Sequence, residues 1–244
     1  MEGPSLVILK EEVSTFKGKK ILKAGGYGEI DHSRLVNHVV KDFKTWGKHF
    51  LVCFNKYTLR IHFGLFGSYA INEKRKGRNP SLSLQFNNGS LFCYIAHTKF
   101  IEEKLEDIYD WSLDMLSPKW NPAKVKSLLK KMPGDQQIGD VLLNPDIFSG
   151  VGNIIRNEVL YRCRVHPESL LEAIPAKKVT EIIQQTHIYS LDFLKWKKQD
   201  ELKKRWEVYG KRTCPKGHTV TKQYTGKTKR RSFICETCVK EYMT

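Results

Sequence analysis

The stretch Cys214-Pro-Lys-Gly-His218, with Cys235-Glu-Thr-Cys238 after sixteen intervening residues, decides how the C-terminal part of this chain folds. Three thiols and one imidazole in two close pairs suit tetrahedral Zn²⁺. The surrounding segment 211–244 carries nine Lys or Arg and two Glu, so it needs a cross-link in place of an apolar core. We predict one structural Zn²⁺ on Cys214, His218, Cys235 and Cys238. Chance spacing or a redox Cys-x-x-Cys pair is the alternative, but neither requires the upstream Cys/His pair.

A basic segment lies between the two ligand pairs. Lys227, Lys229, Arg230 and Arg231 fall where the tip of a β-hairpin is expected, and a basic tip suits nucleic-acid phosphates; a solvated turn is the alternative. The whole chain has 42 Lys and Arg against 26 Asp and Glu, for a formal net charge of +16. This excess favours a polyanionic partner, in most cases nucleic acid, over a generically basic soluble protein.

Gly150-Val151-Gly152-Asn153 precedes a predicted helix. Two glycines allow a close approach, Asn153 is a suitable N-cap, and the free N–H groups of a helix start bind anions. The spacing is not the dinucleotide fingerprint, because the third glycine is missing and no strand precedes it. The residues alone therefore leave a phosphate site and an ordinary helix–turn–helix elbow equally open.

The N-terminal half carries strand signals after one helix. An apolar stripe predicts the leading helix and consists of Leu6, Leu9, Val13 and Phe16. The apolar run 50–54 and the alternation over 57–63 and 82–86 predict strands, and Asn88-Gly89 predicts a two-residue hairpin turn before 91–95. Isolated Cys53, Cys93 and Cys163 are expected to be buried thiols.

The chain is long enough for more than one domain. It has 244 residues, 40% of them hydrophobic, which excludes wholesale disorder. We predict four parts: a β-domain 1–105, a linker 106–122, a helical domain 123–210 and a zinc finger 211–244. No stretch approaches the ~20 apolar residues of a membrane span, and there is no signal-peptide pattern. A cytoplasmic protein is expected, nucleoid-associated if bacterial.

Together these motifs resemble the formamidopyrimidine-DNA glycosylase / endonuclease VIII family. Met1-Glu2-Gly3-Pro4 resembles the family's N-terminus, and residues 150–158 resemble its helix–two-turn–helix signature. Val208-Tyr209-Gly210 and the Cys ligands resemble its zinc finger. Trp46-Gly47-Lys48 and the run 62–67 fit its N-terminal domain. The motifs occur in matching order along the whole chain, and their joint occurrence is specific.

The resemblance implies an α+β fold: an N-terminal antiparallel β-sandwich with flanking helices, a helix–two-turn–helix domain and a C-terminal β-hairpin zinc finger. It implies a monomeric, bifunctional DNA glycosylase/AP lyase of base-excision repair acting on damaged DNA. An N-terminal amine would expel an oxidised base through a Schiff base, and elimination would cleave the strand. A non-catalytic damaged-DNA-binding protein on the same scaffold is the main alternative. A zinc-containing RNA-binding protein leaves Glu2 and the Gly-Val-Gly-Asn turn unexplained.

The resemblance also assigns roles to single residues. The catalytic group consists of Met1 as the nucleophilic amine, Glu2 as the general acid and Lys48 as the phosphate contact beside the lesion. The DNA-binding group consists of Asn153 and Arg230 on phosphates, Arg231 as the neighbouring alternative, and Leu65 and Phe66 as the wedge that fills the gap left by the flipped base. For the wedge pair, burial in the core is the alternative. An α-amino group has a pKa of ~7.7–8.0 against ~10.4 for lysine, so far more of it is neutral near pH 7.5.

Three positions depart from the family pattern. The usual N-terminal Pro is replaced by Met1 before Glu2, which makes the amine primary. Ser5 stands where Glu is frequent, and His218 stands where many members have Cys, a change that zinc tolerates. The segment 192–210 reads as continuous charged helix up to about Val208, without room for a loop that caps oxidised purines. Oxidised pyrimidines and ring-opened purines are therefore expected over 8-oxoguanine.

Overall fold

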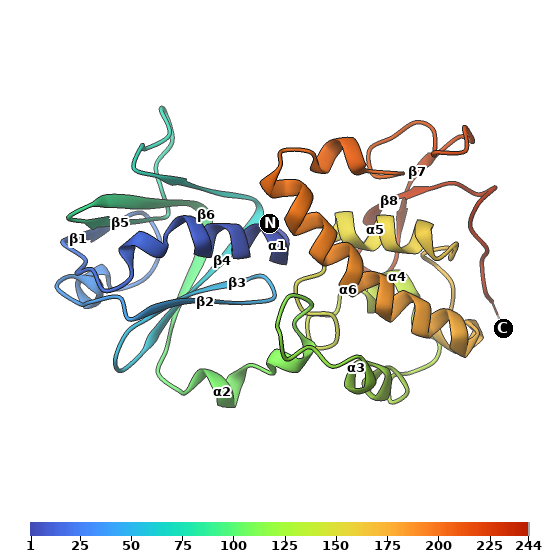
Figure 1. Cartoon of the computed structure of the whole chain (residues 1–244), viewed down its shortest axis with the longest axis horizontal. Coiled ribbons are helices and arrows are strands. Elements are labelled where there is room, and N and C mark those ends of the chain that lie inside the picture. Colours follow the sequence, from blue (N-terminus) through green and yellow to red (C-terminus); the bar gives the residue numbers. More distant parts are fainter. Residues whose placement is uncertain (244) are drawn as a thin grey trace. The chain divides into compact units, whose positions relative to one another are not determined.

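The computed structural model describes residues 1–243 and divides after Asp110 into two units, which are treated separately (Figure 1). It confirms the predicted α+β class, with an antiparallel sheet in the first unit and helices with a C-terminal β-hairpin in the second. The predicted four-part division stays a prediction. Over residues 1–243 the structure contains no helix both long enough and apolar enough to span a membrane.

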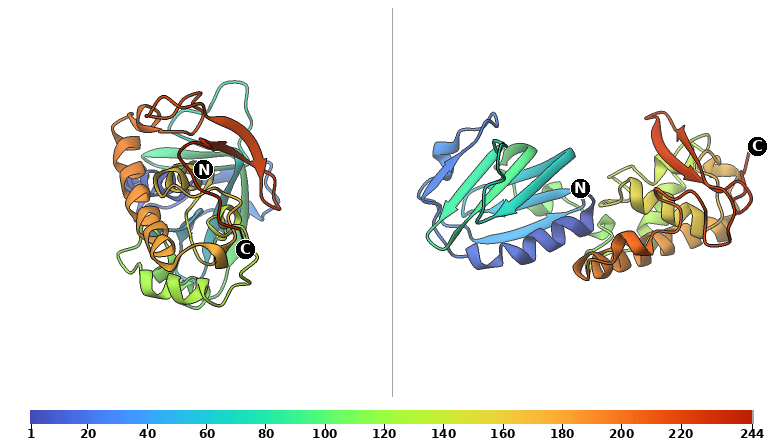
Figure 2. Two further views of the ribbon diagram at one scale, coloured as in Figure 1. Left: turned by 90° about the vertical axis from the view of Figure 1, so that its right-hand side faces the viewer. Right: turned by 90° about the horizontal axis from the view of Figure 1, so that it is seen from above.

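The first unit is a six-stranded antiparallel sheet with a helix along one face (Figure 2). The strand order is β1-β5-β6-β4-β3-β2. The helices are α1 (Gly3–Glu12) and α2 (Leu105–Ile108), with short 3-10 turns η1 (Ser14–Phe16) and η2 (His32–Leu35). The strands are β1 (Lys23–Gly25), β2 (Asp42–Trp46), β3 (His49–Cys53), β4 (Thr58–Ile71), β5 (Leu82–Phe86) and β6 (Gly89–Ile101).

The leading helix forms because its apolar stripe is buried. Leu6, Leu9 and Val13 are fully buried, and Phe16 stacks on Phe86 of β5 with ring centroids 4.4 Å apart. All four stripe residues belong to the same core as the inward-facing side chains of the sheet. The helix prediction is therefore confirmed, and this packing fixes the chain's first residues against the sheet.

The hairpin between β5 and β6 turns one residue earlier than predicted. Phe86 pairs with Gly89, so the two turn residues are Asn87 and Asn88. Gly89 is already a strand residue with φ +153°, and a Cβ there would meet the Oδ1 of Asn72 at 2.3 Å. The glycine is needed for close approach in the strand, and the predicted Asn88-Gly89 turn is wrong by one position.

The second unit packs short helices around one long one, with the hairpin at its C-terminal end (Figure 1). Its helices are α3 (Pro122–Leu129), α4 (Ile138–Val141), α5 (Asn153–Arg162) and α6 (Ala176–Lys198), with 3-10 turns η3 (Trp111–Leu113), η4 (Leu171–Ala173) and η5 (Leu202–Arg205). The hairpin strands are β7 (Thr221–Thr225) and β8 (Arg230–Ile234). Ile155 and Val159 of α5 and Ile182 of α6 are buried in one apolar core, and Cys163 is buried there too, as Cys53 and Cys93 are in the first unit.

The predicted continuous helix to Val208 is wrong, because α6 ends at Lys198. Asp200 takes a left-handed conformation with φ +56°. Its N–H donates to the Lys197 carbonyl at 3.2 Å, and the N–H of Glu201 donates to the Trp196 carbonyl at 2.8 Å. This is a Schellman ending with Asp in the place that Gly usually takes, so the sequence lacked the common stop signal.

Candidate functional site

The N-terminus of the chain is held by the start of α1. Glu2 is the extended N-cap residue of that helix, with φ −99° and ψ 162°, and its carbonyl accepts from the N–H of Ser5 at 3.0 Å. Pro4 stands in the first turn, where its fixed φ suits helix initiation. Met1 is half-buried and packs against the core of the first unit. The amine of residue 1 and the carboxylate of residue 2 are thus anchored to one ordered element.

An imidazole of β4 binds the backbone of Lys48 and feels the charge of the N-terminal amine. The Nδ1 of His62 donates to the Lys48 carbonyl at 3.1 Å, which leaves Nε2 as the second ring nitrogen. Burial lowers the pKa of His62, and the positive charges of Lys48 and of the N-terminal amine lower it further. The hydrogen bond to the Lys48 carbonyl acts in the opposite direction and raises the pKa. The structure therefore joins His62 to the Lys48 backbone, within range of the N-terminal charge. Sequence reasoning included His62 only as part of a motif and gave it no role.

A second histidine extends this cluster. The rings of His49 and His62 lie edge to face with centroids 5.4 Å apart, and His49 Nδ1 is 3.1 Å from the Tyr109 hydroxyl. Burial lowers the pKa of His49 to about 4, helped by the charges of Arg60, His62 and Lys48. The His49 imidazole is therefore neutral at pH 7, and the lowered pKa of His62 favours its neutral form too.

Leu65 and Phe66 project into solvent from a bulge in β4. The pairing of β4 with β6 is interrupted between Phe63 and Ser68, and the two side chains are 78% and 76% exposed. Gly67 permits the bulge, because a Cβ there would lie 2.8 Å from the Cβ of Phe63. Burial in the core, the alternative for this pair, is therefore wrong.

The four predicted metal ligands converge in the second unit. Their ligand atoms all lie within 4.8 Å of one another. The sulfurs of Cys214 and Cys238 are 4.0 Å apart, and the Nδ1 of His218 is 3.2 Å from the Cys238 sulfur. Tetrahedral Zn²⁺ with its usual bond lengths needs roughly 3.8 Å between sulfurs and 3.5 Å between nitrogen and sulfur. The group could hold a metal ion, and its dimensions fit zinc.

Two asparagines of α5 bind the open edge of β8. The Nδ2 of Asn153 donates to the Arg231 carbonyl at 2.8 Å, and the N–H of Phe233 donates to the Oδ1 of Asn157 at 2.7 Å. Positions i and i+4 lie on one helix face, so these two amides satisfy backbone groups that an edge strand leaves open. Gly152, not Asn153, is the N-cap, so the predicted capping role of Asn153 is wrong.

Arg156 joins α5 to both strands of the hairpin, a role that the sequence did not reveal. Its side chain is fully buried. Nη1 donates to Ser232 Oγ at 2.8 Å, Nη2 to Thr225 Oγ1 at 2.7 Å, and Nε to the Gly139 carbonyl at 2.9 Å. Nη1 also lies 3.3 Å from the Oδ1 of Asn153. Burial lowers the pKa of Arg156 to about 10, so the guanidinium stays charged at pH 7.

A buried carboxylate fixes the segment before the hairpin. Both oxygens of Glu158 accept backbone N–H bonds, from Glu207 at 2.8 Å, Val208 at 3.0 Å and Tyr209 at 2.7 Å. Burial raises the pKa of Glu158, while the three N–H groups act in the opposite direction. The chain between α6 and the finger is therefore short and anchored to α5.

Comparison with known proteins supports the family resemblance that the sequence motifs indicated. A family model described as the formamidopyrimidine-DNA glycosylase H2TH domain matches residues 112–189. Endonuclease 8-like 3 of Mus musculus is 31% identical over 85% of this chain and 36% of its own length. Endonuclease 8-like 2 of Mus musculus is 29% identical over 69% of this chain and 53% of its own length. The second unit therefore contains the H2TH domain of the formamidopyrimidine-DNA glycosylase family, and most of the chain is similar to Endonuclease 8-like proteins.

Solved structures agree on the fold. A viral DNA glycosylase superposes with a TM-score of 0.83 at 20% identity, covering 98% of this chain and 99% of the other. The formamidopyrimidine-DNA glycosylase of Lactococcus lactis, bound to DNA with an AP site, gives 0.86 at 17% identity, covering 99% and 100%. By contrast, the chain spans about a third of the length of Endonuclease 8-like 3 and about half of Endonuclease 8-like 2.

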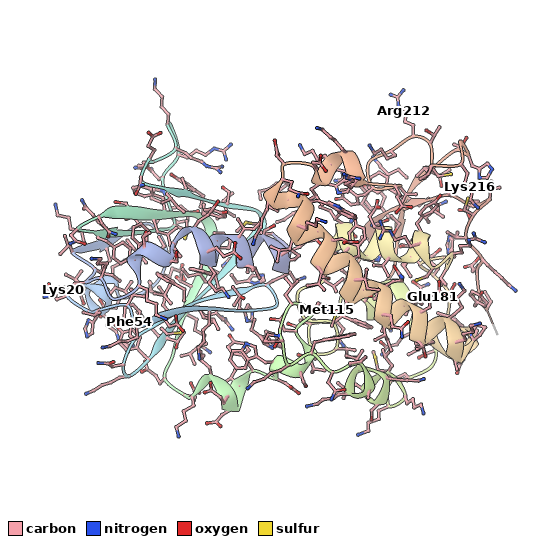
Figure 3. The ribbon with its side chains drawn as sticks, in the orientation of Figure 1. Lys20, Phe54, Met115, Glu181, Arg212 and Lys216 are labelled. Carbon is pink, nitrogen blue, oxygen red and sulfur yellow. The ribbon has the colours of Figure 1, made fainter. Side chains whose placement is uncertain are left out.

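In this formamidopyrimidine-DNA glycosylase scaffold, the two candidate hairpin arginines lie on opposite faces. Arg230 pairs with Thr225, so its side chain lies on the Arg156 face, and its charge acts on Arg156. Arg231 lies on the other face, and only its carbonyl meets Asn153. The structure thus brings Asn153, Arg156 and Arg230 together in the second unit. Further cations, Arg212 and Lys216, extend into solvent near the first ligand pair (Figure 3).

Proposed function

We propose that this chain is a bifunctional DNA glycosylase/AP lyase of base-excision repair that acts on oxidised bases. The observation that carries the proposal is the hydrogen bond from His62 to the Lys48 carbonyl, at a ring whose pKa is also lowered by the charge of the N-terminal amine. A neutral amine, a carboxylate at the next residue and a phosphate-binding cation are the groups that the reaction requires. Glu2 adjoins that amine through the backbone, at the N-cap of α1.

The proposed chemistry begins with the Met1 nitrogen. This nitrogen attacks C1′ of the damaged nucleotide. The bond between C1′ and the base breaks, and the electron pair of that bond leaves with the base. Glu2 donates a proton to the sugar ring oxygen, which opens the ring and lets the nitrogen and C1′ form an imine after loss of a proton. Removal of a C2′ proton then expels the 3′ phosphate and cleaves the strand. Lys48 would hold the phosphate beside the lesion.

In the second unit, Asn153 and Arg230 would bind phosphates and Cys214, His218, Cys235 and Cys238 would hold one structural Zn²⁺. Two features support this: Asn153 lies beside Arg156, on which the charge of Arg230 also acts, and the ligand group has the size that zinc needs. Leu65 and Phe66 would fill the gap left by the flipped base, which their exposure supports. Damaged DNA is the proposed partner and a monomer the proposed state.

For the lesion, we propose oxidised pyrimidines and ring-opened purines before 8-oxoguanine. The continuous helix no longer supports this preference. The anchoring of residues 207–209 by Glu158 does, because it leaves little free chain between α6 and the finger to cap a purine. Single-lesion oligonucleotides test it: faster excision of 8-oxoguanine than of thymine glycol would contradict the preference.

Borohydride trapping on an abasic-site duplex tests the activity. The reductant should fix the imine as a covalent protein–DNA band, and an uncleaved N-terminal extension should abolish that band. Glu2→Gln should reduce base excision by at least about 100-fold with DNA affinity retained, since it removes a proton donor. Glu11→Gln, on the same helix, is the control and should behave as wild type.

A second function, damaged-DNA binding without catalysis, is favoured by one observation: residue 1 is Met, which supplies a primary amine where the family usually has Pro. If the wild-type chain binds the abasic duplex but gives no borohydride adduct, this second function replaces the first. If the adduct persists in the extended protein, another amine is the nucleophile.

A further inference from the structure

The finger hairpin has an outer face that the Asn153–Arg156 site does not use. In the β7–β8 ladder, Tyr224 lies opposite Arg231, and Lys222 lies opposite Phe233. Opposed residues and alternate residues along a strand share a face, so these four side chains lie on one side of the hairpin. The other side carries the buried hydroxyls of Thr225 and Ser232 that bind Arg156.

Tyr224 is the aromatic residue exposed on this outer face. Its side chain is 63% accessible, and within residues 1–243 no hydrogen bond or ring contact engages it. A solvent-exposed aromatic ring contributes little to the stability of the fold, because the stabilisation comes from burying it. The position therefore fits contact with a ligand better than it fits packing.

Two cations flank the ring. Lys222 and Arg231 are both exposed, and in the described part of the chain neither side chain takes part in an ion pair or hydrogen bond. Phe233 completes the face and packs edge to face on Tyr209, with centroids 4.9 Å apart. The face thus combines an open aromatic ring with unpaired positive charge and carries no carboxylate, which complements a polyanion with flat apolar groups.

We infer that Lys222, Tyr224 and Arg231 form a binding surface for single-stranded DNA, in which an unpaired base stacks on the Tyr224 ring. The choice of DNA as the polyanion rests on the proposed function. Phosphates on either side of the stacked base would meet the two cations. In a duplex each base is covered by its neighbours in the stack, so the ring selects unpaired bases. Removing such a stack typically weakens binding roughly 5- to 150-fold.

Fluorescence anisotropy with a labelled oligothymidylate 20-mer tests this surface, with inorganic polyphosphate as a polyanion that has no bases. Tyr224→Ala should weaken oligothymidylate binding by about fivefold or more, leave polyphosphate binding unchanged and leave the salt dependence intact. Tyr224→Phe should bind as wild type. Arg231→Ala should instead lower the salt slope by about 0.7, the contribution of one phosphate contact on a single strand.

Tyr27→Ala is the matched control, because Tyr27 is 61% exposed in the first unit and should matter for neither ligand. Tyr224→Thr keeps a good strand former without the ring and should match Tyr224→Ala, which separates stacking from folding. The inference would be overturned if Tyr224→Ala and Tyr224→Thr both bound oligothymidylate with wild-type affinity. It would also be overturned if they lost as much affinity for polyphosphate, or for a blunt undamaged duplex, as for oligothymidylate. Borohydride trapping is read separately: its failure in wild type overturns the proposed function and leaves single-strand binding to be judged on its own result.

Discussion

At the scale of single residues, Arg156 shows how one side chain can join two parts of a fold. Its guanidinium binds three oxygens within 2.9 Å, on Gly139, Thr225 and Ser232. Arg156 lies in the 150–158 motif, but nothing in the sequence marks this role, because an Arg near the start of a helix ordinarily lies in solvent. Its hairpin partners follow 69 and 76 residues later, so only the tertiary structure reveals the site.

Arg156→Met should lower the free energy of unfolding of the second unit by about 3 kcal/mol, because buried polar groups lose their charged donor. The measurement is guanidinium unfolding followed by a probe in that unit. Arg205→Met is the control: Arg205 is 53% exposed and forms a surface ion pair with Glu201, so its loss should cost under about 0.5 kcal/mol. Equal effects of the two substitutions would show that the Arg156 contacts do not hold the hairpin.

At the scale of elements, the ligand spacing and the strand alternation could be read from the sequence, because both depend on neighbours along the chain. Ligand pairs three or four residues apart predicted the metal group, and period-two patterns predicted the strands. The end of α6 could not be read, since Asp200 replaces the usual glycine. In the proposed catalytic site, the motifs indicated Lys48, while the contact of His62 with the Lys48 backbone became visible only in the structure.

The finger as an element gives a prediction on metal removal. Cys235→Ala, or chelation, should unfold the hairpin and release about one zinc per chain, because this segment has only a small apolar cluster besides the metal group. Thermal unfolding of the first unit should change little, since its core is separate. Metal analysis and differential scanning calorimetry measure both effects. An unchanged hairpin in the metal-free protein would show that the Arg156 and Asn153 contacts suffice.

At the scale of the whole molecule, the net charge of +16 suits the proposed DNA partner, and the salt dependence of binding would report how many phosphates the protein contacts. If Lys48 of the first unit and Arg230 of the second each contact one phosphate of a bound duplex, Arg230→Ala and Lys48→Ala should each reduce the slope of log K against log salt by about 0.9. The double variant should reduce this slope by about 1.8, because the two contacts release separate counterions.

Lys20→Ala is the control for this experiment, because Lys20 is also exposed but lies outside the proposed site. It should leave the slope nearly unchanged, since a distant charge contributes through the general field and not through a bound phosphate. If the double variant reduces the salt slope no more than either single variant does, one unit binds the duplex alone. Full additivity on a duplex too short for two proteins would require that both units engage the same DNA molecule.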